Sequence, residues 1–371
     1  MLDIVYDHQI FSIQRFGGIS RYFVELAAVL GARRDCAVRV VAPAHINALL
    51  DTLPRRAVLG RRVRAVRGTA RARIEANHLL TGAYLHARPP SLVHETYFHA
   101  HRAGPPRVPR VVTVYDMIAE RLVGDRVVAR AKRAAVARAD HVICISHTTR
   151  DDLLSCVDGL APEHVSVVHL GCRLRDVAAG GEDSDAECAA SDSRPPFLLY
   201  VGDRGGYKNF AGLLTALVRS REFRTADCRL LCFGGGPLTP AERTHIAETI
   251  GAQRVVHESG DDACLAWCYR RAAALVYPSR YEGFGIPPLE AMAAGCPVLA
   301  STGGSIPEIV GDAAELFPPD DHDAIAAAVD GVLASAERRA TLVGRGYARA
   351  RQFSWERCAE QTLTVYRALV R

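Results

Sequence analysis

Residues 277–297, YPSRYEGFGIPPLEAMAAGCP, constrain the fold of this chain more than any other stretch. They begin at the end of an apolar run, residues 272–277, which predicts a buried strand. A turn containing Gly283 and Gly285 follows, and Pro288 stands where a helix would begin. The sequence therefore predicts a strand, a glycine-rich turn and a helix. Such a junction presents backbone N–H groups and the positive end of a helix dipole to an anion, usually a phosphate.

Two carboxylates frame this turn, Glu282 inside it and Glu290 in the expected first turn of the helix. Because Glu282 lies outside the helix, the two do not form an acid–base pair on one helix face. They are better placed as hydrogen-bond acceptors at the two ends of a polyhydroxy ligand whose phosphates lie between them. Taken alone, Glu290 is explained equally well by electrostatic stabilisation of a helix start.

The whole pattern, E-G-F-G-x-P-x-x-E-A-M-A-x-G-x-P-V, resembles the donor-binding signature of the retaining nucleotide-sugar glycosyltransferases of family 4, which have the GT-B fold. The resemblance implies that Glu282 faces the donor sugar and that Glu290 binds the ribose hydroxyls. It implies that the backbone between them meets the sugar and the diphosphate, at Gly283, Phe284, Gly285 and Ile286.

A second glycine-rich junction, residues 202–209 (GDRGGYKN), follows another predicted strand and leads into a helix. Cations and glycines at such a junction suit a diphosphate. The family has an Arg and a Lys here, so the resemblance implies that Arg204 and Lys208 clamp the diphosphate beside Gly202. Lys208 is one of only two lysines among 46 basic residues, which favours a position that needs a compact ammonium. The resemblance also places His257 near the nucleotide base.

The N-terminal half has candidates of its own. The sequence GGISRY resembles the family's N-terminal motif, in which Gly17 and Gly18 approach the donor phosphates and the acceptor. His94 is expected in the substrate pocket, because it lies at the carboxyl end of a predicted strand, where open α/β sheets bind ligands. The family commonly has His-Asp where this chain has Tyr115-Asp116, so Asp116, His94 or the Tyr115 hydroxyl is expected to supply the missing contact.

No metal or other cofactor is expected. His99 and His101 form an H-x-H pair without further ligands at zinc-site spacing, which is a weak signal. Two D-x-D sequences occur, but residues 183–185 belong to the expected linker and residues 321–323 to an acidic surface turn. The cations and helix N-termini are instead expected to stabilise the charge of the leaving diphosphate.

Positive charge is concentrated in the N-terminal half. Residues 1–170 carry 24 of the 46 basic residues but 15 of the 41 acidic ones, and residues 55–73 contain eight arginines. Few aromatic residues interleave with these arginines, which argues against nucleic-acid binding. An anionic membrane surface or a phosphate-bearing acceptor fits better, and a solvated arginine-rich face is the alternative. No apolar run is long enough to span a membrane, and the first residues lack the basic start of a secretory signal. We expect a cytoplasmic protein, peripheral at the inner face of the cytoplasmic membrane.

The alternation of strands and helices predicts an α/β fold with two Rossmann-like, doubly wound domains that face a cleft, as in GT-B proteins. We expect an acceptor domain at residues 1–175, a linker at 176–196, a donor domain at 197–353, and a C-terminal helix, 354–371, that packs back across the domains.

The expected activity is a metal-independent transfer, with retention, of a sugar from a nucleoside-diphosphate sugar to a hydroxyl of a glycan or lipid-linked acceptor in cell-envelope polysaccharide or glycolipid biosynthesis. GDP-mannose is favoured as the donor because relatives with the GGISRY motif often act in surface-polysaccharide assembly. A sugar-nucleotide epimerase on the same fold and a non-catalytic nucleotide-sugar-binding subunit remain the alternatives.

Overall fold

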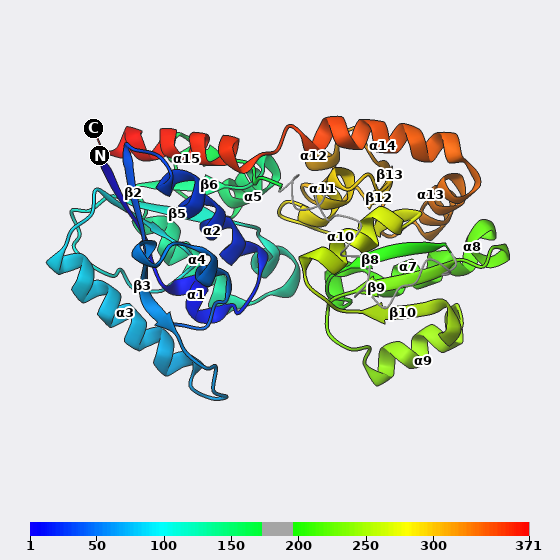
Figure 1. The fold of residues 1–371 in the computed structure, drawn as a ribbon, viewed down its shortest axis with the longest axis horizontal. Helices are drawn as coiled ribbons and strands as arrows, with labels where there is room; N and C mark the ends of the chain where they lie inside the picture. Colours follow the sequence, from blue (N-terminus) through cyan, green and yellow to red (C-terminus); the bar gives the residue numbers. More distant parts are fainter. Residues whose placement is uncertain (173–195, 371) are drawn as a thin grey trace. The chain divides into compact units, whose positions relative to one another are not determined.

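The computed structural model describes residues 1–172 and 196–370, so the linker expected at 176–196 lies outside the described residues except for its last position. The chain forms two compact units. Unit 1 comprises Met1–Gly171 together with Trp355–Arg371, and unit 2 comprises Cys172–Ser354 (Figure 1). Each unit is built on one parallel sheet with helices around it, which confirms the predicted α/β class with two Rossmann-like halves.

The sheet of unit 1 has seven strands, and each described pair of neighbouring strands runs parallel. In spatial order the strands are β3 (Val58–Arg62), β2 (Cys36–His45), β1 (Leu2–Tyr6), β4 (Leu92–Glu95), β5 (Arg110–Val114), β6 (His141–Cys144) and β7 (Val165–Val167). The strand order reverses between β1 and β4. At such a reversal the loops leaving the two strands part to opposite faces and open a crevice at their carboxyl ends.

The α-helices described in unit 1 are α1 (Gln9–Ile13), α2 (Gly18–Gly31), α3 (Ala70–Ala87), α4 (Arg126–Arg138), α5 (His147–Cys156) and α15 (Trp355–Leu369). Their ends follow local chemistry: the Asp125 carboxylate accepts from two N–H groups of α4, and the predicted cap Ser146 accepts from Thr149 N at 3.0 Å. The C-terminal helix α15, red in Figure 1, packs beside α2. No helix within the described ranges combines the length and apolarity that a membrane span requires.

The sheet of unit 2 has six parallel strands. In spatial order they are β10 (Val255–Glu258), β9 (Arg229–Phe233), β8 (Phe197–Val201), β11 (Ala274–Tyr277), β12 (Val298–Ser301) and β13 (Glu315–Phe317). The helices are α7 (Phe210–Arg219), α8 (Arg221–Thr225), α9 (Pro240–Thr249), α10 (Asp262–Arg271), α11 (Ile286–Ala293), α12 (Ile306–Val310), α13 (His322–Ala334) and α14 (Ala336–Ala350). The order of the strands reverses between β8 and β11.

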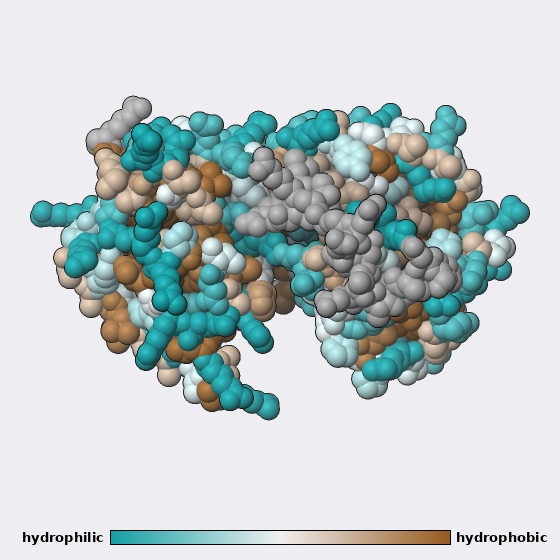
Figure 2. All heavy atoms as spheres, in the orientation of Figure 1, coloured by the Kyte–Doolittle hydropathy of each residue, from teal (hydrophilic) through white to brown (hydrophobic). Residues whose placement is uncertain are grey.

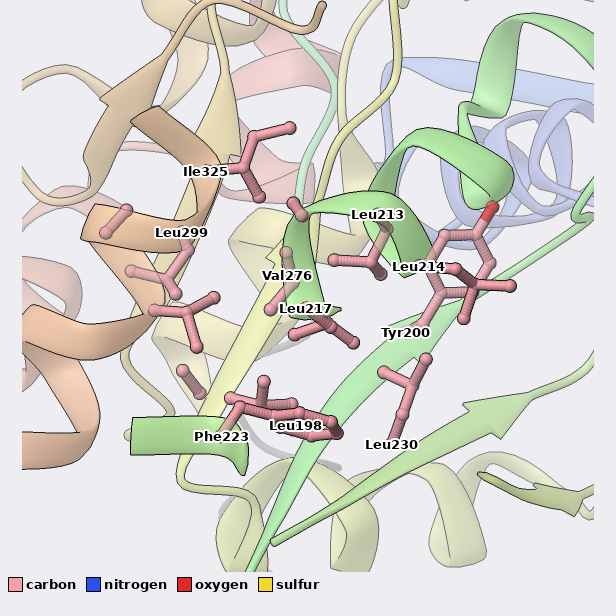
Figure 3. Packing of buried hydrophobic residues seen from close by; sticks show 14 of the residues in the cluster. Leu198, Tyr200, Leu213, Leu214, Leu217, Phe223, Leu230, Val276, Leu299 and Ile325 are labelled. Carbon is pink, nitrogen blue, oxygen red and sulfur yellow. The ribbon is translucent and has the colours of Figure 1, made fainter. Parts of the chain in front are cut away.

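The core of unit 2 fills the space between its sheet and the helices α7, α8 and α13. Leu198 and Val276, from the central strands, meet Leu213 and Leu217 of α7, and all four are fully buried (Figure 3). All four residues of β11 are buried, as expected for a central parallel strand covered on both faces. This rigid centre fixes the strand ends from which the candidate site loops depart.

The arginine-rich segment at 55–73 contains regular structure. The structure has an edge strand, β3, and the start of α3 there. An edge strand pairs on one side only, so β3 accommodates the exposed Arg61 and Arg62 without an alternating apolar pattern. In helix α3, the large apolar residues Leu79 and Leu80 are exposed. The apolar residues of this helix therefore do not mark a single buried face in the sequence.

Candidate active site

The loops that follow β8 and β11 meet at the strand-order reversal of unit 2. Lys208 lies in the loop after β8, six residues beyond Gly202. Its Nζ donates to Oε1 of Glu282 at 2.7 Å. Their side chains are 17% and 10% exposed. The ammonium also lies 5.2 Å from the Tyr207 ring centre and 5.6 Å from that of Tyr277. The structure therefore brings together two of the predicted site residues that lie far apart in the sequence.

Tyr277 ends β11 directly beneath this ion pair. Burial, reinforced by the Glu282 carboxylate, raises the pKa of Tyr277 well above its ordinary value, so the phenol stays protonated. A neutral phenol beside the carboxylate leaves Lys208 as the charged group paired with Glu282. The ammonium has three N–H donors, and a single donor suffices for Glu282.

Arg204 is held differently from the prediction. Its Nε donates to Glu242 at 2.9 Å and Nη1 to Gly234 O at 2.9 Å, while Nη2 donates to the carbonyls of Gly235, Gly236 and Pro237. Every nitrogen of the guanidinium is bonded within the protein, and the side chain is only 2% exposed. We therefore assign Arg204 a structural role, bracing the glycine turn after β9, in place of the predicted role as a diphosphate clamp.

The turn that carries Glu282 is fixed from behind by the loop after β12, a feature that the sequence analysis missed. Ser305 donates from its N–H and its Oγ to the Glu282 carbonyl, both at 3.0 Å, and from Oγ to the Phe284 carbonyl at 3.0 Å. Gly304 adopts φ +60°, and a Cβ there would overlap the Glu282 carbonyl oxygen. The sequence Gly-Gly-Ser at the carboxyl end of a strand was the available signal.

Glu290 lies on α11, which begins at Ile286. It is therefore in the second turn of the helix, and the first turn contains no acidic residue. The helix-dipole effect falls off within the first turn, so this position weakens the purely electrostatic explanation of Glu290. Its Oε2 accepts from the Tyr269 hydroxyl at 3.1 Å, and burial raises the pKa of Tyr269 well above its ordinary value.

The other donor-binding candidates of unit 2 lie at strand ends. Gly285 is the N-cap of α11 with φ +108°, and Phe284 is buried with its ring against Phe353. A ligand there would meet the backbone of Gly283 to Ile286, because the Phe284 side chain points into the protein. Gly202 follows β8, and Nε2 of His257, on the edge strand β10, lies 3.1 Å from the Gly234 carbonyl oxygen.

The two D-x-D sequences were not expected to bind a metal. Residues 183–185 lie outside the described residues, and Asp321 caps α13.

In unit 1 the predicted glycines lie at the start of α2. Gly17 is the N-cap and Gly18 the first helical residue. Asp116 follows β5: its Oδ1 accepts from Ile118 N at 3.0 Å, and its side chain is 35% exposed. Tyr115 is buried and donates its hydroxyl to the Thr96 carbonyl at 3.2 Å, so it does not face a substrate. Of the three candidates for the missing family histidine contact, Asp116 alone has a partly exposed side chain.

His94 has no exposed surface. Its Nδ1 pairs with the Tyr366 hydroxyl at 2.5 Å and its Nε2 with Thr113 Oγ1 at 2.8 Å. Burial lowers the pKa of His94 to about 3, so the ring is neutral at physiological pH. Because both ring nitrogens are bonded inside unit 1, we assign His94 the structural role of anchoring α15 in place of the predicted substrate contact.

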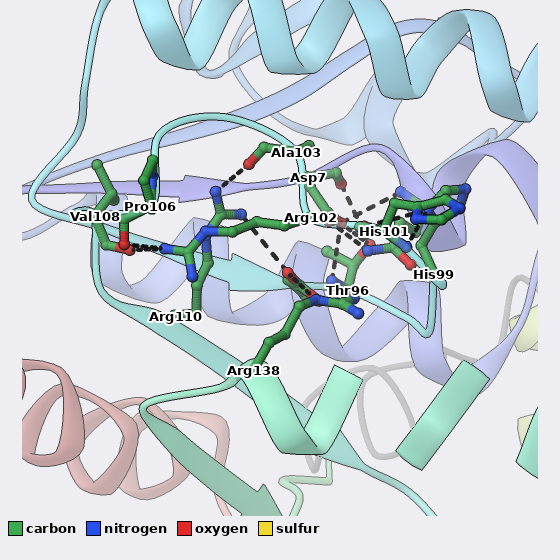
Figure 4. Close-up of polar contacts among 12 residues, drawn as sticks. Asp7, Thr96, His99, His101, Arg102, Ala103, Pro106, Val108, Arg110 and Arg138 are labelled. Atoms are coloured by element: carbon green, nitrogen blue, oxygen red, sulfur yellow. Dashed lines mark hydrogen bonds and ion pairs between the residues drawn. The ribbon is translucent and has the colours of Figure 1, made fainter. Parts of the chain in front are cut away.

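Polar side chains tie together the loops that follow β1 and β4, where the sheet order of unit 1 reverses (Figure 4). The buried Asp7 accepts from the N–H of Thr96 at 2.9 Å and from its hydroxyl at 2.7 Å. Beyond them, His101 N donates to Nδ1 of His99 at 3.1 Å, so this H-x-H pair stabilises its own turn. Asp7 and Thr96 were missed because no motif links them in the sequence.

Comparison with known proteins agrees with this geometry. Residues 183–349 match the family described as glycosyl transferases group 1, and residues 16–175 match glycosyltransferase family 4. The O-antigen chain mannosyltransferase B of Escherichia coli is 28% identical over 95% of this chain and 96% of its own. The alpha-maltose-1-phosphate synthase of Mycolicibacterium smegmatis is 31% identical over 70% of this chain and 73% of its own.

Among solved structures, Anabaena Alr3699/HepE in complex with UDP and glucose superposes with a TM-score of 0.73 at 16% identity, covering 99% of this chain and 100% of that one. Two Rossmann-like units, each built on a parallel sheet, are the architecture of the GT-B fold. This chain belongs to the group 1 glycosyltransferases, the family that the motif around Glu282 resembles.

Proposed function

We propose that this glycosyltransferase moves mannose from GDP-mannose to a hydroxyl of a glycan or lipid-linked acceptor in the synthesis of a cell-envelope polysaccharide or glycolipid, with retention and without a metal ion. The observation that carries the proposal is the Lys208–Glu282 ion pair at the strand-order reversal of unit 2. Mannose is supported by the E. coli relative, a mannosyltransferase similar to this chain along almost the whole length of both. Its role in the O-antigen supports the cell-envelope setting.

The chemical difficulty of the reaction is the charge on the departing diphosphate. Lys208 keeps N–H donors beyond the one given to Glu282, so it can stabilise a phosphate oxygen as the bond to the anomeric carbon breaks. The start of α11 adds its dipole, but Pro287 and Pro288 lack N–H groups. Backbone donors are thereby confined to the residues just before these prolines. Lys208 must consequently supply a larger share of the stabilisation.

Glu282 is placed to act on the sugar. Its backbone is fixed by Ser305, and its carboxylate is held by Lys208. As the glycosyl bond breaks, positive charge grows on the sugar, and a fixed carboxylate stabilises that charge. The acceptor oxygen forms the new bond to the anomeric carbon, and its proton passes to the departing diphosphate on the same face. This front-face exchange accounts for retention without a covalent intermediate on the protein.

Assay of purified protein with GDP-mannose tests the proposal. We expect GDP release that depends on added lipid-linked glycan acceptor, persists in EDTA, and yields an α-mannoside by NMR. Faster turnover of a UDP- or dTDP-sugar would show that GDP-mannose is not the preferred donor. A β-linked product would contradict retention, and loss of activity in EDTA would contradict metal independence.

A non-catalytic nucleotide-sugar-binding subunit is the second candidate. It is favoured by one observation: Tyr115 replaces the family histidine, and its buried hydroxyl is bonded to Thr96. This candidate predicts tight nucleotide-sugar binding with no donor turnover under any acceptor condition. Measurable GDP release from GDP-mannose would eliminate it.

A further inference from the structure

A cavity in unit 1 has a basic lining that the proposed donor chemistry does not use. It has a volume of about 480 Å³ and is lined by Arg15, Ile46, Arg62, Val63, Arg64 and Ala65. We propose that this cavity binds a phosphate group of the acceptor, so that the acceptor is a phosphate ester or diphosphate. The inference rests on the proposed function, because it assigns a chemical class to the second substrate of the same reaction.

The cavity adjoins the loop that carries the predicted glycines. Arg15 lies two residues before Gly17, and its carbonyl accepts from Ala48 N at 3.0 Å. The neighbouring Gln14 accepts from Asn47 through its carbonyl at 2.9 Å and from Ser20 N through its side chain at 3.3 Å. These bonds fix the loop between α1 and α2 against the segment that follows β2. A phosphate in the cavity would therefore sit close to the backbone expected to meet the reacting groups.

The other wall of the cavity continues from the edge strand β3. The register between β2 and β3 shifts at Gly60, whose φ is +151° and where a Cβ would overlap the Ala42 carbonyl oxygen. Beyond the shift, Val63 N donates to His45 O at 2.7 Å, which holds the segment bearing Arg62 and Arg64 against the sheet. Bulges of this kind redirect side chains next to binding sites. A second basic cavity, which shares Arg62, continues along the same strand.

The charge of the cavity is only partly neutralised. Arg62 pairs with Asp51 at 2.8 Å, and both side chains are about half exposed. Arg15 lies with its guanidinium 5.6 Å from the Phe16 ring centre. In the described ranges, the side chains of Arg15 and Arg64 form no ion pair with a carboxylate. Two planar guanidinium forks without a protein anion match the geometry of phosphate oxygens.

Hydrophilic side chains also project from the tip of the loop between β3 and α3 (Figure 2). Arg67 in this loop and Arg71 at the start of α3 are exposed but do not line the cavity. Phosphate chemistry could reach this region as a membrane headgroup or as an acceptor group. A cavity specific for the acceptor depends on Arg15 and Arg64, whereas a membrane face uses all the arginines alike. Arg67 and Arg71 therefore provide matched controls.

The test is calorimetric titration of inorganic pyrophosphate into protein saturated with GDP, so that the donor site is already filled. We expect one pyrophosphate bound per wild-type chain, at least tenfold weaker binding by Arg15→Gln/Arg64→Gln, and less than a twofold change in Arg67→Gln/Arg71→Gln. Melting curves identify any unfolded variant, and Arg64→Gln alone, at an exposed position, repeats the measurement with the least perturbation.

Two calorimetric outcomes overturn the inference: no pyrophosphate binding to the GDP-saturated wild type, or equal weakening of pyrophosphate binding in both double variants. Sedimentation with phosphatidylglycerol vesicles tests the membrane alternative. If vesicle binding falls equally in both double variants while pyrophosphate binding is unchanged, the arginines form a membrane face and the inference is overturned. Acceptor-dependent release of GDP from GDP-mannose by the wild type separates this inference from the proposed function. If that release occurs without pyrophosphate binding, the cavity assignment alone fails. If pyrophosphate binds but no donor turnover occurs with any acceptor, the cavity assignment stands and the proposed activity fails.

Discussion

The Nζ atom of Lys208 lies 2.7 Å from Oε1 of Glu282 and thereby joins the loops that leave β8 and β11. Lys208→Ala removes the cation and leaves Glu282 without this partner, so we expect turnover to fall by about 10²-fold or more, as for the loss of one preorganised charge contact. Steady-state release of GDP measures it. A loss smaller than about threefold would remove Lys208 from the reacting centre.

The two glutamates should separate binding from turnover. Glu290 is expected to accept from the ribose hydroxyls, so Glu290→Ala should weaken GDP binding by roughly 1.5–3 kcal/mol. Glu282 is expected to touch only the transferred sugar, so Glu282→Ala should lower turnover and leave GDP affinity nearly unchanged. Calorimetry and melting curves of both variants decide. If Glu290→Ala changes only the melting temperature, its role is structural; if Glu282→Ala loses GDP binding, the two roles are misassigned.

Arg204 should behave as a structural residue. Removing it deprives Glu242 Oε1 and the carbonyls of Gly235, Gly236 and Pro237 of this donor, so Arg204→Ala should destabilise the protein by about 3 kcal/mol or more. Arg204→Lys keeps the charge but loses the planar fork and should recover little of the loss. Denaturant unfolding gives the change in stability. If Arg204→Ala has wild-type stability but no longer binds GDP, Arg204 clamps the diphosphate as the sequence predicted.

Acid should weaken unit 1 through His94. In the unfolded chain a histidine titrates near pH 6.5, whereas burial lowers the pKa of His94 to about 3 in the folded protein. Between these values only the unfolded state binds the proton. The stabilisation that the folded protein gains from burying neutral His94 is therefore fully present above pH 6.5. As the pH falls below 6.5, the free energy of unfolding decreases by at most about 1.4 kcal/mol per pH unit.

His94→Gln should be less stable at neutral pH but should show a flatter dependence of unfolding free energy between pH 6.5 and 4. His86→Gln, at an exposed histidine of unit 1, is the control substitution. Parallel slopes for the wild type and His94→Gln would show that burial does not lower the pKa of His94 in the folded protein.

The basic segment at 55–73 predicts binding to an anionic membrane. Sedimentation with phosphatidylglycerol vesicles should be salt-sensitive and should weaken in Arg67→Glu/Arg71→Glu, since each positive charge near such a surface contributes about 1 kcal/mol. Phosphatidylcholine vesicles are the control. Binding that salt does not affect, or no binding, would leave a solvated arginine-rich face.

The strongest predictions from sequence concerned segments with both a local pattern and a motif. The strand, glycine turn and helix around Glu282 were predictable because prolines, glycines and apolar runs act locally. The environment of Arg204 was not, since its acceptors lie about thirty residues away on another loop. His94 was correctly placed on a strand, but its burial depends on Tyr366, which comes from the other end of the chain. A sequence pattern identifies the strand end; long-range packing decides whether its side chain faces a ligand or the core.

The anchoring of α15 by His94 also bears on how this protein is made. Unit 2 is one continuous segment, whereas unit 1 is completed only by the residues from Trp355 onward, among which Tyr366 is fully buried. On the ribosome, unit 2 has all its strands before unit 1 has its last helix. The α15-binding surface of the N-terminal unit therefore stays uncovered until the residues from Trp355 to Tyr366 have been synthesised. A chain that stops short of Tyr366 would release a finished unit 2 attached to an N-terminal unit with an open core.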